Sequence, residues 1–141
     1  MKNNPLNIRQ SNTKFIGEKE STNAFKDFIT IEFGYRAAFR NINTYISQYK
    51  VNTLEGIINR WAPPNENDTQ NYIKFVCEKT GFDRQKQFIK SDTDLIPMVY
   101  AMSWIENGIK SNYRQVEIGY KLINVQSVNE GITIINDLQA I

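Results

Sequence analysis

The apolar stretch from Leu95 to Gly108 constrains the fold of this chain more than any other segment. Asp92 or Asp94 can cap it as a helix, and Gly108 can end that helix. Its residues are apolar on nearly every face, and a helix without a polar face is typical of the centre of a domain. We therefore expect this helix to be buried, with the other elements packed around it.

Glu106 is the one acidic residue within that stretch. In the last helical turn it faces the negative end of the helix dipole, with Trp104 and Ile105 nearby, and both influences should raise the pKa of its carboxyl group. A carboxyl group that stays protonated near neutral pH suits a general acid, as in the cleavage of glycosidic bonds. The alternative is an ordinary solvated Glu at a helix end, which the local pattern alone favours.

The chain contains no histidine and one cysteine. Ser-His and Cys-His catalysis and His-based metal sites are therefore excluded. Cys77 lies in an amphipathic helical pattern and is interpreted as a core thiol. Acid–base chemistry falls to carboxylates, Tyr, Lys or the amino terminus, and we expect neither a metal nor a cofactor.

Size and charge narrow the class of protein further. With 141 residues, 40% of them hydrophobic, we expect one domain over residues 1–141. The net charge of +2 comes from interspersed residues, which does not indicate nucleic-acid binding but suits an anionic polymer such as a bacterial cell wall. The start lacks the apolar core of a signal peptide and no segment has the length of a membrane span, so we expect synthesis in the host cytoplasm and no membrane insertion.

Capping residues and helical periodicity predict five further helices. We expect them over residues 31–49, from 54 to Pro63-Pro64, and over 69–80, 115–122 and 128–141, although Gly119 weakens the fourth. Ser127 and Glu130 have the spacing of a capping box for the last helix. Residues 14–16 and 25–29 are candidate strands flanking residues 17–23. The expected fold class is mainly α with a small β-hairpin or irregular lobe.

Three blocks of the sequence resemble a family of small phage and prophage proteins. They are Asn3-Asn4-Pro5-Leu6-Asn7-Ile8-Arg9, Gly34-Tyr35-Arg36-Ala37, and Arg60-Trp61-Ala62-Pro63-Pro64-Asn65-Glu66-Asn67-Asp68-Thr69 followed by Tyr72-Ile73. That family is described as phage structural proteins, and it is similar to the cell-wall lysin carried in the virions of enveloped double-stranded RNA phages. The resemblance covers the first half of the chain and implies a lysozyme-like helical domain that acts on peptidoglycan.

A second resemblance concerns the order of the elements. Flagellar and autolysin-type glucosaminidases, also lysozyme-like, begin with a helix ending Glu-Ser-Gly and continue through an Asn-Asn-Leu-Phe-Gly-Ile-Lys segment to a Tyr-Ala-Thr-Asp-Pro-x-Tyr turn. Residues 3–9 and 61–72 resemble the later elements, whereas Ile105-Glu106-Asn107-Gly108 resembles the first but comes after them. We infer a circularly permuted lysozyme-like domain in which Glu106 is the general acid, because permutation is tolerated where termini lie close together.

Three other carboxylates are alternatives. Glu32 is the main rival acid, but the first turn of a helix stabilises its ionised form and favours a structural role. Glu18 and Glu20 lie in the expected hairpin loop, where they are either a second catalytic carboxylate or solvated loop residues, and the lysine-containing polar run favours the loop. A lytic transglycosylase needs no second carboxylate, whereas an inverting hydrolase does.

Five residues are candidate sugar-binding residues. Asn3, Asn4 and Asn7 either present amides to acetamido groups or stabilise ordinary turns. Trp61 and Tyr72 either form walls on which sugar rings stack or belong to the core.

The sequence thus predicts a monomeric phage lysin that cleaves the glycan strand of peptidoglycan as a lytic transglycosylase or muramidase. If it is carried in a virion, other virion proteins are further partners. One alternative is a virion structural or wall-binding protein without turnover. A peptidoglycan endopeptidase ranks lower, because the usual zinc and thiol peptidase chemistries need His or a Cys pair.

Overall fold

Six α-helices and one two-stranded hairpin form the computed structural model, which describes residues 3–108 and 112–140. The strands are β1 (Glu18–Lys19) and β2 (Asp27–Phe28), paired antiparallel. The helices are α1 (Ile31–Ser47), α2 (Leu54–Trp61), α3 (Thr69–Thr80), α4 (Leu95–Asn107), α5 (Tyr113–Lys121) and α6 (Val128–Gln139). The predicted mainly helical fold with a small hairpin is confirmed, while Ile141, expected in the last helix, lies outside the described residues.

Polar side chains cap the helices where the sequence predicted. Donors at the helix starts bond to the side chains of Thr30 (α1), Thr53 (α2), Asp68 (α3) and Ser127 (α6). Only half of the predicted capping box of α6 forms as expected, because the Glu130 carboxylate accepts from the N–H of Gln126 instead of that of Ser127. Local sequence therefore accounts for most helix starts.

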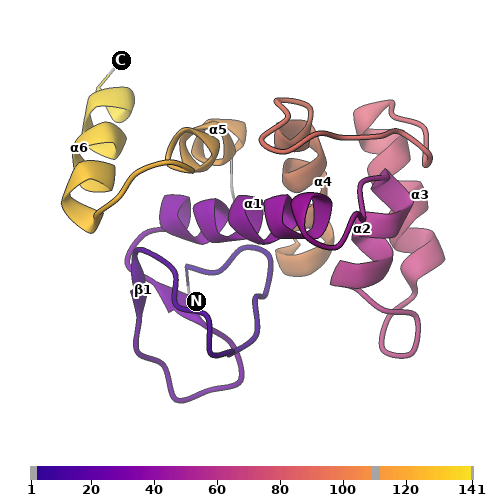
Figure 1. Ribbon diagram of the computed structural model, residues 1–141, viewed down its shortest axis with the longest axis horizontal. Helices are drawn as coiled ribbons and strands as arrows, with labels where there is room; N and C mark the ends of the chain where they lie inside the picture. The colour runs from indigo at the N-terminus through magenta and orange to yellow at the C-terminus, as the bar shows by residue number, and fades with distance from the viewer. Residues whose placement is uncertain (1–2, 109–111, 141) are drawn as a thin grey trace.

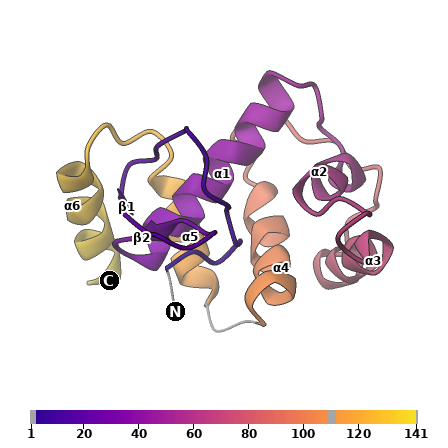
Figure 2. The same cartoon turned by 90° about the horizontal axis from the view of Figure 1, so that it is seen from below.

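Helix α1, not α4, forms the centre of the molecule. It runs through the middle of Figures 1 and 2, with the N-terminal lobe on one side, α5 on the opposite side, and α2 and α3 beyond its C-terminal end. Ten of its 17 residues are buried. The expectation that α4 would be buried on all sides was wrong, since Trp104 and Ile105 are 38% and 42% exposed. α4 instead buries one face against α1, α3 and α5.

Helix α5 approaches α1 closely at Gly119. A Cβ atom at this position would lie 2.4 Å from the Cβ of Tyr35, so no larger residue fits without movement of one helix. The glycine that weakened the helix prediction is therefore a packing requirement, and its cost in helix propensity is about 1 kcal/mol.

The N-terminal lobe differs from the prediction in its first strand. Residues 14–16 are not a strand; β1 follows them at Glu18–Lys19 and pairs with residues of β2. The expectation of a solvated loop was also wrong for Glu18, because its carboxylate lies 3.0 Å from the fully buried Nζ of Lys26 and its side chain is 6% exposed. Glu20 is exposed, as expected of a loop residue.

No helix within residues 3–108 and 112–140 is long and apolar enough to cross a bilayer.

Candidate active site

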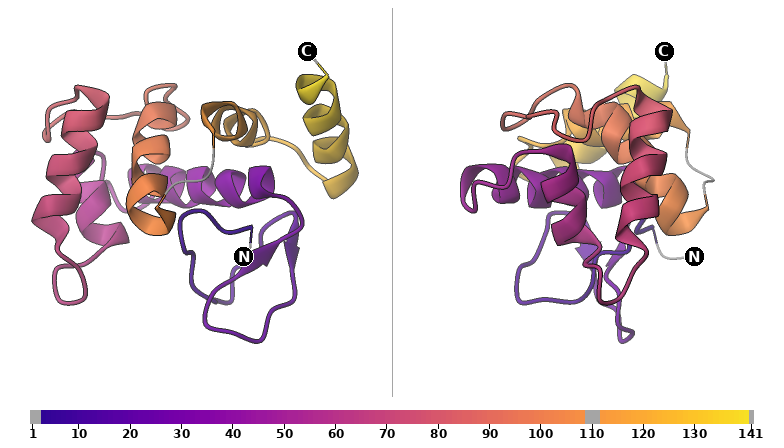
Figure 3. Two further views of the ribbon diagram at one scale, coloured as in Figure 1. Left: turned by 180° about the vertical axis from the view of Figure 1, so that it is seen from behind. Right: turned by 90° about the vertical axis from the view of Figure 1, so that its right-hand side faces the viewer.

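Glu106 occupies the last turn of α4, where two side chains from distant parts of the sequence hold its carboxyl group. The Nδ2 amide of Asn7 donates to Oε1 at 3.0 Å and to the main-chain oxygen of Glu106 at 2.9 Å. The hydroxyl of Tyr72 in α3 donates to Oε2 at 2.9 Å. Figure 3 shows the end of α4 near the N-terminal segment that carries Asn7.

Burial sets the proton affinity of this pair. Desolvation raises the pKa of Glu106 above its ordinary value, and the hydrogen bonds from Tyr72 and Asn7 oppose that rise without cancelling it. The pKa of Tyr72 is raised well above its ordinary value, first by burial and then by the adjacent carboxylate. Tyr72 therefore keeps its proton over the physiological range, while Glu106 retains its proton to a higher pH than an exposed Glu.

The segment carrying Asn7 reaches Glu106 because α1 has a glycine where they cross. A Cβ atom at Gly34 would lie 2.2 Å from the carbonyl oxygen of Asn3 and 2.7 Å from Cδ of Pro5. The Gly34 block identified in the sequence thus serves to seat the N-terminal segment against α1.

Further side-chain hydrogen bonds hold the main chain of the same segment in place. The amide of Asn4 donates to the carbonyls of Ile8 and Lys26, both at 2.9 Å, and Asn107 donates to the carbonyl of Pro5. The indole N–H of Trp61 donates to the carbonyl of Leu6 at 3.1 Å. Asn7 itself has φ of 53°, a left-handed conformation that Asn tolerates better than most residues.

A pocket of about 250 Å³ opens beside Glu106. Its lining comes from the N-terminal lobe, the end of α2 with the loop after it, and α4: Leu6, Asn7, Arg9, Phe25, Trp61, Ala62, Pro63, Glu66, Asn67 and Glu106. The structure thus brings together Glu106, Asn7 and Trp61, three of the residues predicted from sequence, in one cavity. Tyr72 lies beneath, 4% exposed, and so supports the carboxyl group without offering a ring face to a sugar.

Asn3 and Asn4 do not line this pocket. Asn4 is 4% exposed and its amide is used by the main chain, while the amide of Asn3 donates to the carbonyl of Phe28 at 3.1 Å. Asn4 therefore stabilises the local turn, which was one of its two predicted roles, whereas Asn3 ties the N-terminal segment to β2.

The other predicted carboxylates lie away from Glu106. Glu32 is 3% exposed and accepts a bond from Nε2 of Gln139, which ties α1 to α6. Glu18 and Glu20 line a separate pocket in the hairpin lobe that Glu106 does not reach. Sequence reasoning missed Glu66, an exposed residue of the loop after α2 that lines the same pocket as Glu106. The sequence feature that could have identified Glu66 is its position in the block that begins Arg60-Trp61-Ala62-Pro63-Pro64.

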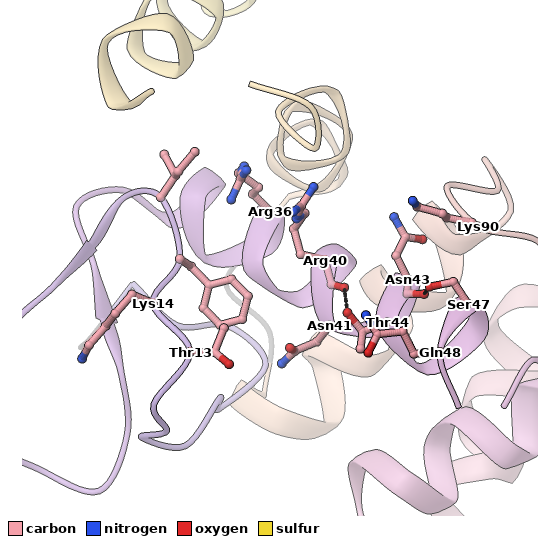
Figure 4. A pocket seen from close by; sticks show the side chains of 12 residues that line it. Thr13, Lys14, Arg36, Arg40, Asn41, Asn43, Thr44, Ser47, Gln48 and Lys90 are labelled. Atoms are coloured by element: carbon pink, nitrogen blue, oxygen red, sulfur yellow. Dashed lines mark hydrogen bonds between the residues drawn. The ribbon is translucent and has the colours of Figure 1, made fainter. Parts of the chain in front are cut away.

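The pocket beside Glu106 adjoins a larger one of about 610 Å³, and Asn7, Arg9 and Trp61 line both. We call these two adjoining pockets the groove. A further pocket of about 400 Å³, drawn in Figure 4, meets the groove at Thr13, Asn41 and Thr44.

Two arginines of α1 border the pocket of Figure 4. In that figure Arg36 and Arg40 leave α1 next to one another. Both bond main-chain carbonyls just after α5, at Leu122 and Ile123. Burial, with a smaller contribution from Arg40, lowers the pKa of Arg36 to about 10. This pair therefore fastens the end of α5 to α1.

Within the described part of the chain, no group of three or more His, Cys, Asp or Glu side chains is placed to hold a metal ion. Cys77 is partly buried, and burial raises the pKa of its thiol.

Comparison with known proteins places the chain among phage proteins. No family model matches it. It is 38% identical over 125 residues to Protein P5 of Pseudoalteromonas phage PM2, a match that covers 84% of this chain and 77% of that protein. The chain therefore belongs to the family of phage proteins that includes Protein P5 of phage PM2.

Proposed function

We propose that this protein is a phage lysin that cleaves the glycan strand of peptidoglycan, with Glu106 as general acid and base. The observation that carries the proposal is a carboxyl group with a raised pKa that borders an open pocket beside Trp61. Buried carboxyl groups of this kind are typical proton donors in glycoside cleavage. The resemblance of the blocks around Asn7, Trp61 and Glu106 to lysozyme-like enzymes, in permuted order, supports the same function.

The donors around Glu106 suit a proton that is given and then taken back. Nδ2 of Asn7 can only donate, so Oε1 remains an acceptor and the proton resides on Oε2, beside Tyr72. Transfer of this proton to the glycosidic oxygen breaks the bond from that oxygen to C1. The carboxylate left behind then accepts the proton of the sugar's own 6-hydroxyl as that oxygen attacks C1, which closes a 1,6-anhydro ring and restores the acid.

Glu66 provides the alternative second step. As the other carboxylate lining the pocket among the described residues, it could activate a water molecule that attacks C1 and leaves a free reducing end. The two routes differ in their products by one water molecule per cleaved bond. Replacement of Glu66 by Gln should leave the transglycosylase route unaffected and stop the hydrolytic one.

A non-catalytic role in the virion or on the wall is the second candidate. It is favoured by the fact that both carboxylate oxygens of Glu106 accept bonds, through which the carboxyl group joins α4 to α3 and to the N-terminal segment. Such a carboxyl group could serve only to hold the fold.

Digestion of purified peptidoglycan, with mass analysis of the products, tests the proposal. We expect the wild-type protein and the control Glu78→Gln, an exposed residue of α3, to release glycan fragments, and Glu106→Gln to release none while remaining folded. Full activity of Glu106→Gln would exclude this residue as the acid. Release of peptides from intact strands would indicate an endopeptidase, and binding to the wall without any release would indicate the non-catalytic role.

A further inference from the structure

Two exposed arginines in the groove are held against aromatic rings. The guanidinium carbon of Arg9 lies 5.0 Å from the ring centroid of Phe25. That of Arg60 lies 4.2 Å from the centroid of Tyr49 and 5.0 Å from that of Tyr45. No carboxylate within residues 3–108 and 112–140 is in salt-bridge distance of either arginine. Each therefore presents a positioned positive charge that no side chain of opposite charge neutralises.

Apart from the two arginines, the residues that line the 610 Å³ pocket are uncharged. The 610 Å³ pocket has no acidic residue in its lining, which includes the amides of Asn7, Gln10 and Asn41. The two carboxyl groups of the groove, Glu66 and Glu106, lie together in the smaller pocket, which Arg9 also lines, whereas Arg60 lines the larger pocket. A ligand that extends from Glu106 through the groove thus passes from the acid to a region of positive charge.

We propose that Arg9 and Arg60 bind carboxylates attached to a glycan strand, and so make the protein selective for peptidoglycan over uncharged strands with the same backbone. This inference rests on the proposed function. Every second sugar of peptidoglycan carries a lactyl ether that ends either in a free carboxylate or in a peptide with carboxylates of its own, whereas chitin carries neither. A guanidinium group matches a carboxylate with two parallel N–H donors.

The aromatic contacts prepare both arginines for that task. A ring beneath a guanidinium group restricts its rotation, and a hydrogen bond between Tyr45 and Arg60 restricts Arg60 further, so less entropy is lost when a carboxylate binds. The same contacts argue against single-stranded nucleic acid, which binds by stacking bases on free aromatic faces. Here Arg60 covers one face of each of the two tyrosines.

Equilibrium binding to defined strands tests the proposal, in a Glu106→Gln background that keeps the strands intact. The probes are peptide-free strands with lactyl carboxylates, the same strands after amidation of those groups, chito-oligosaccharides of equal length, and strands that keep their peptides. We expect amidation to weaken binding about tenfold. Tightest binding to peptide-free strands would assign the arginines to the lactyl carboxylate, and tightest binding to peptide-bearing strands would assign them to the peptide carboxylates.

Variants connect the preference to the two arginines. Arg9→Gln and Arg60→Gln should each weaken binding of carboxylated strands about tenfold and leave binding of amidated strands unchanged. Arg60→Lys, which keeps the charge but loses the paired donors, should fall between wild type and Arg60→Gln. Lys121→Gln, which removes an exposed charge of α5 outside the groove, serves as the matched control.

The possible contrary results are distinct. Equal affinity for free and amidated strands, or an equal loss on both in the arginine variants, would overturn the inference. Displacement of the strands by single-stranded DNA of the same charge at equal concentration would overturn it in favour of nucleic-acid binding. Cleavage without any preference for carboxylates would reject this inference alone, whereas preferential binding without cleavage by the wild-type protein would reject the proposed function alone.

Discussion

The bond from Tyr72 to Glu106 predicts a loss of stability that depends on pH. In Tyr72→Phe the ring keeps its packing, and the hydroxyl that donates to Oε2 at 2.9 Å is removed. A hydrogen bond to a charged group contributes about 1.5–3 kcal/mol, and one to a neutral group about 0.5–1.5 kcal/mol. Because Glu106 borders an open pocket, water can replace the lost donor, so we expect the lower end of each range. The variant should lose about 1.5 kcal/mol where Glu106 is ionised and about 0.5 kcal/mol where it is protonated.

The direction of this pH dependence follows from the protonation state of Glu106 that the bond stabilises. The Tyr72 hydroxyl stabilises the ionised form and lowers the pKa of Glu106, against the larger effect of burial. Its contribution is therefore complete above the pKa of the folded state and shrinks as the pH falls through it. Urea denaturation of wild type and variant across this range measures the difference. Tyr120→Phe, which loses a bond to a neutral main-chain carbonyl, should show a constant loss. A loss in Tyr72→Phe that is constant with pH, or larger in acid, would refute the reasoning.

Three further substitutions test other parts of the site. Because the pKa of Glu106 is raised in the folded state, the stability that this residue contributes is complete below its unfolded pKa and is lost as the pH rises through its folded pKa. The unfolding free energy of the wild type should therefore fall relative to that of Glu106→Gln by about 1.36 kcal/mol per unit of raised pKa. Parallel curves of unfolding free energy against pH would contradict this. Gly34→Ala places a Cβ atom against the Asn3 carbonyl and should lower the unfolding free energy by about 1–3 kcal/mol and reduce wall lysis. Unchanged lysis would show that activity does not depend on the contact between the N-terminal segment and α1. Glu18→Gln leaves Lys26 buried and unpaired, and denaturation should reveal a loss of about 3–5 kcal/mol, whereas a loss of activity at unchanged stability would return Glu18 to the catalytic candidates.

The helices were largely predictable because their signals are local. A capping side chain and the periodicity that follows it lie within a few residues, as at Thr30 and Thr53. The first strand was not predictable, since Glu18 and Lys19 carry no alternating apolar pattern and their pairing depends on residues ten and eight positions away. The burial of Glu18 likewise depends on Lys26, a partner that the local sequence does not reveal.

The site was predictable in part for the same reason. Resemblance to known sequences brought Asn7, Trp61 and Glu106 together, and the structure places all three in one pocket. The raised pKa of Glu106 was expected from the helix dipole and from Trp104 and Ile105, but these two side chains are partly exposed, and burial of the carboxyl group is the main cause. Periodicity could not show that donors from α3 and the N-terminal segment surround the carboxyl group, because these contacts span 34 and 99 positions of the sequence.

The bond between Asn7 and Glu106 also determines how the site should come apart. Its partners are 99 residues apart in the sequence, so the bond forms only when α4 and the N-terminal segment are both in place. The N-terminal segment that completes the site contributes no helix to the bundle, so it can detach in a local opening while α1 to α6 stay folded. The carboxyl group would then lose its amide donor at denaturant concentrations that leave the helical signal intact. Leu6 and Ile8 of the segment are buried in the core, and we expect denaturation to separate this opening from unfolding of the helices only where that burial is lost first.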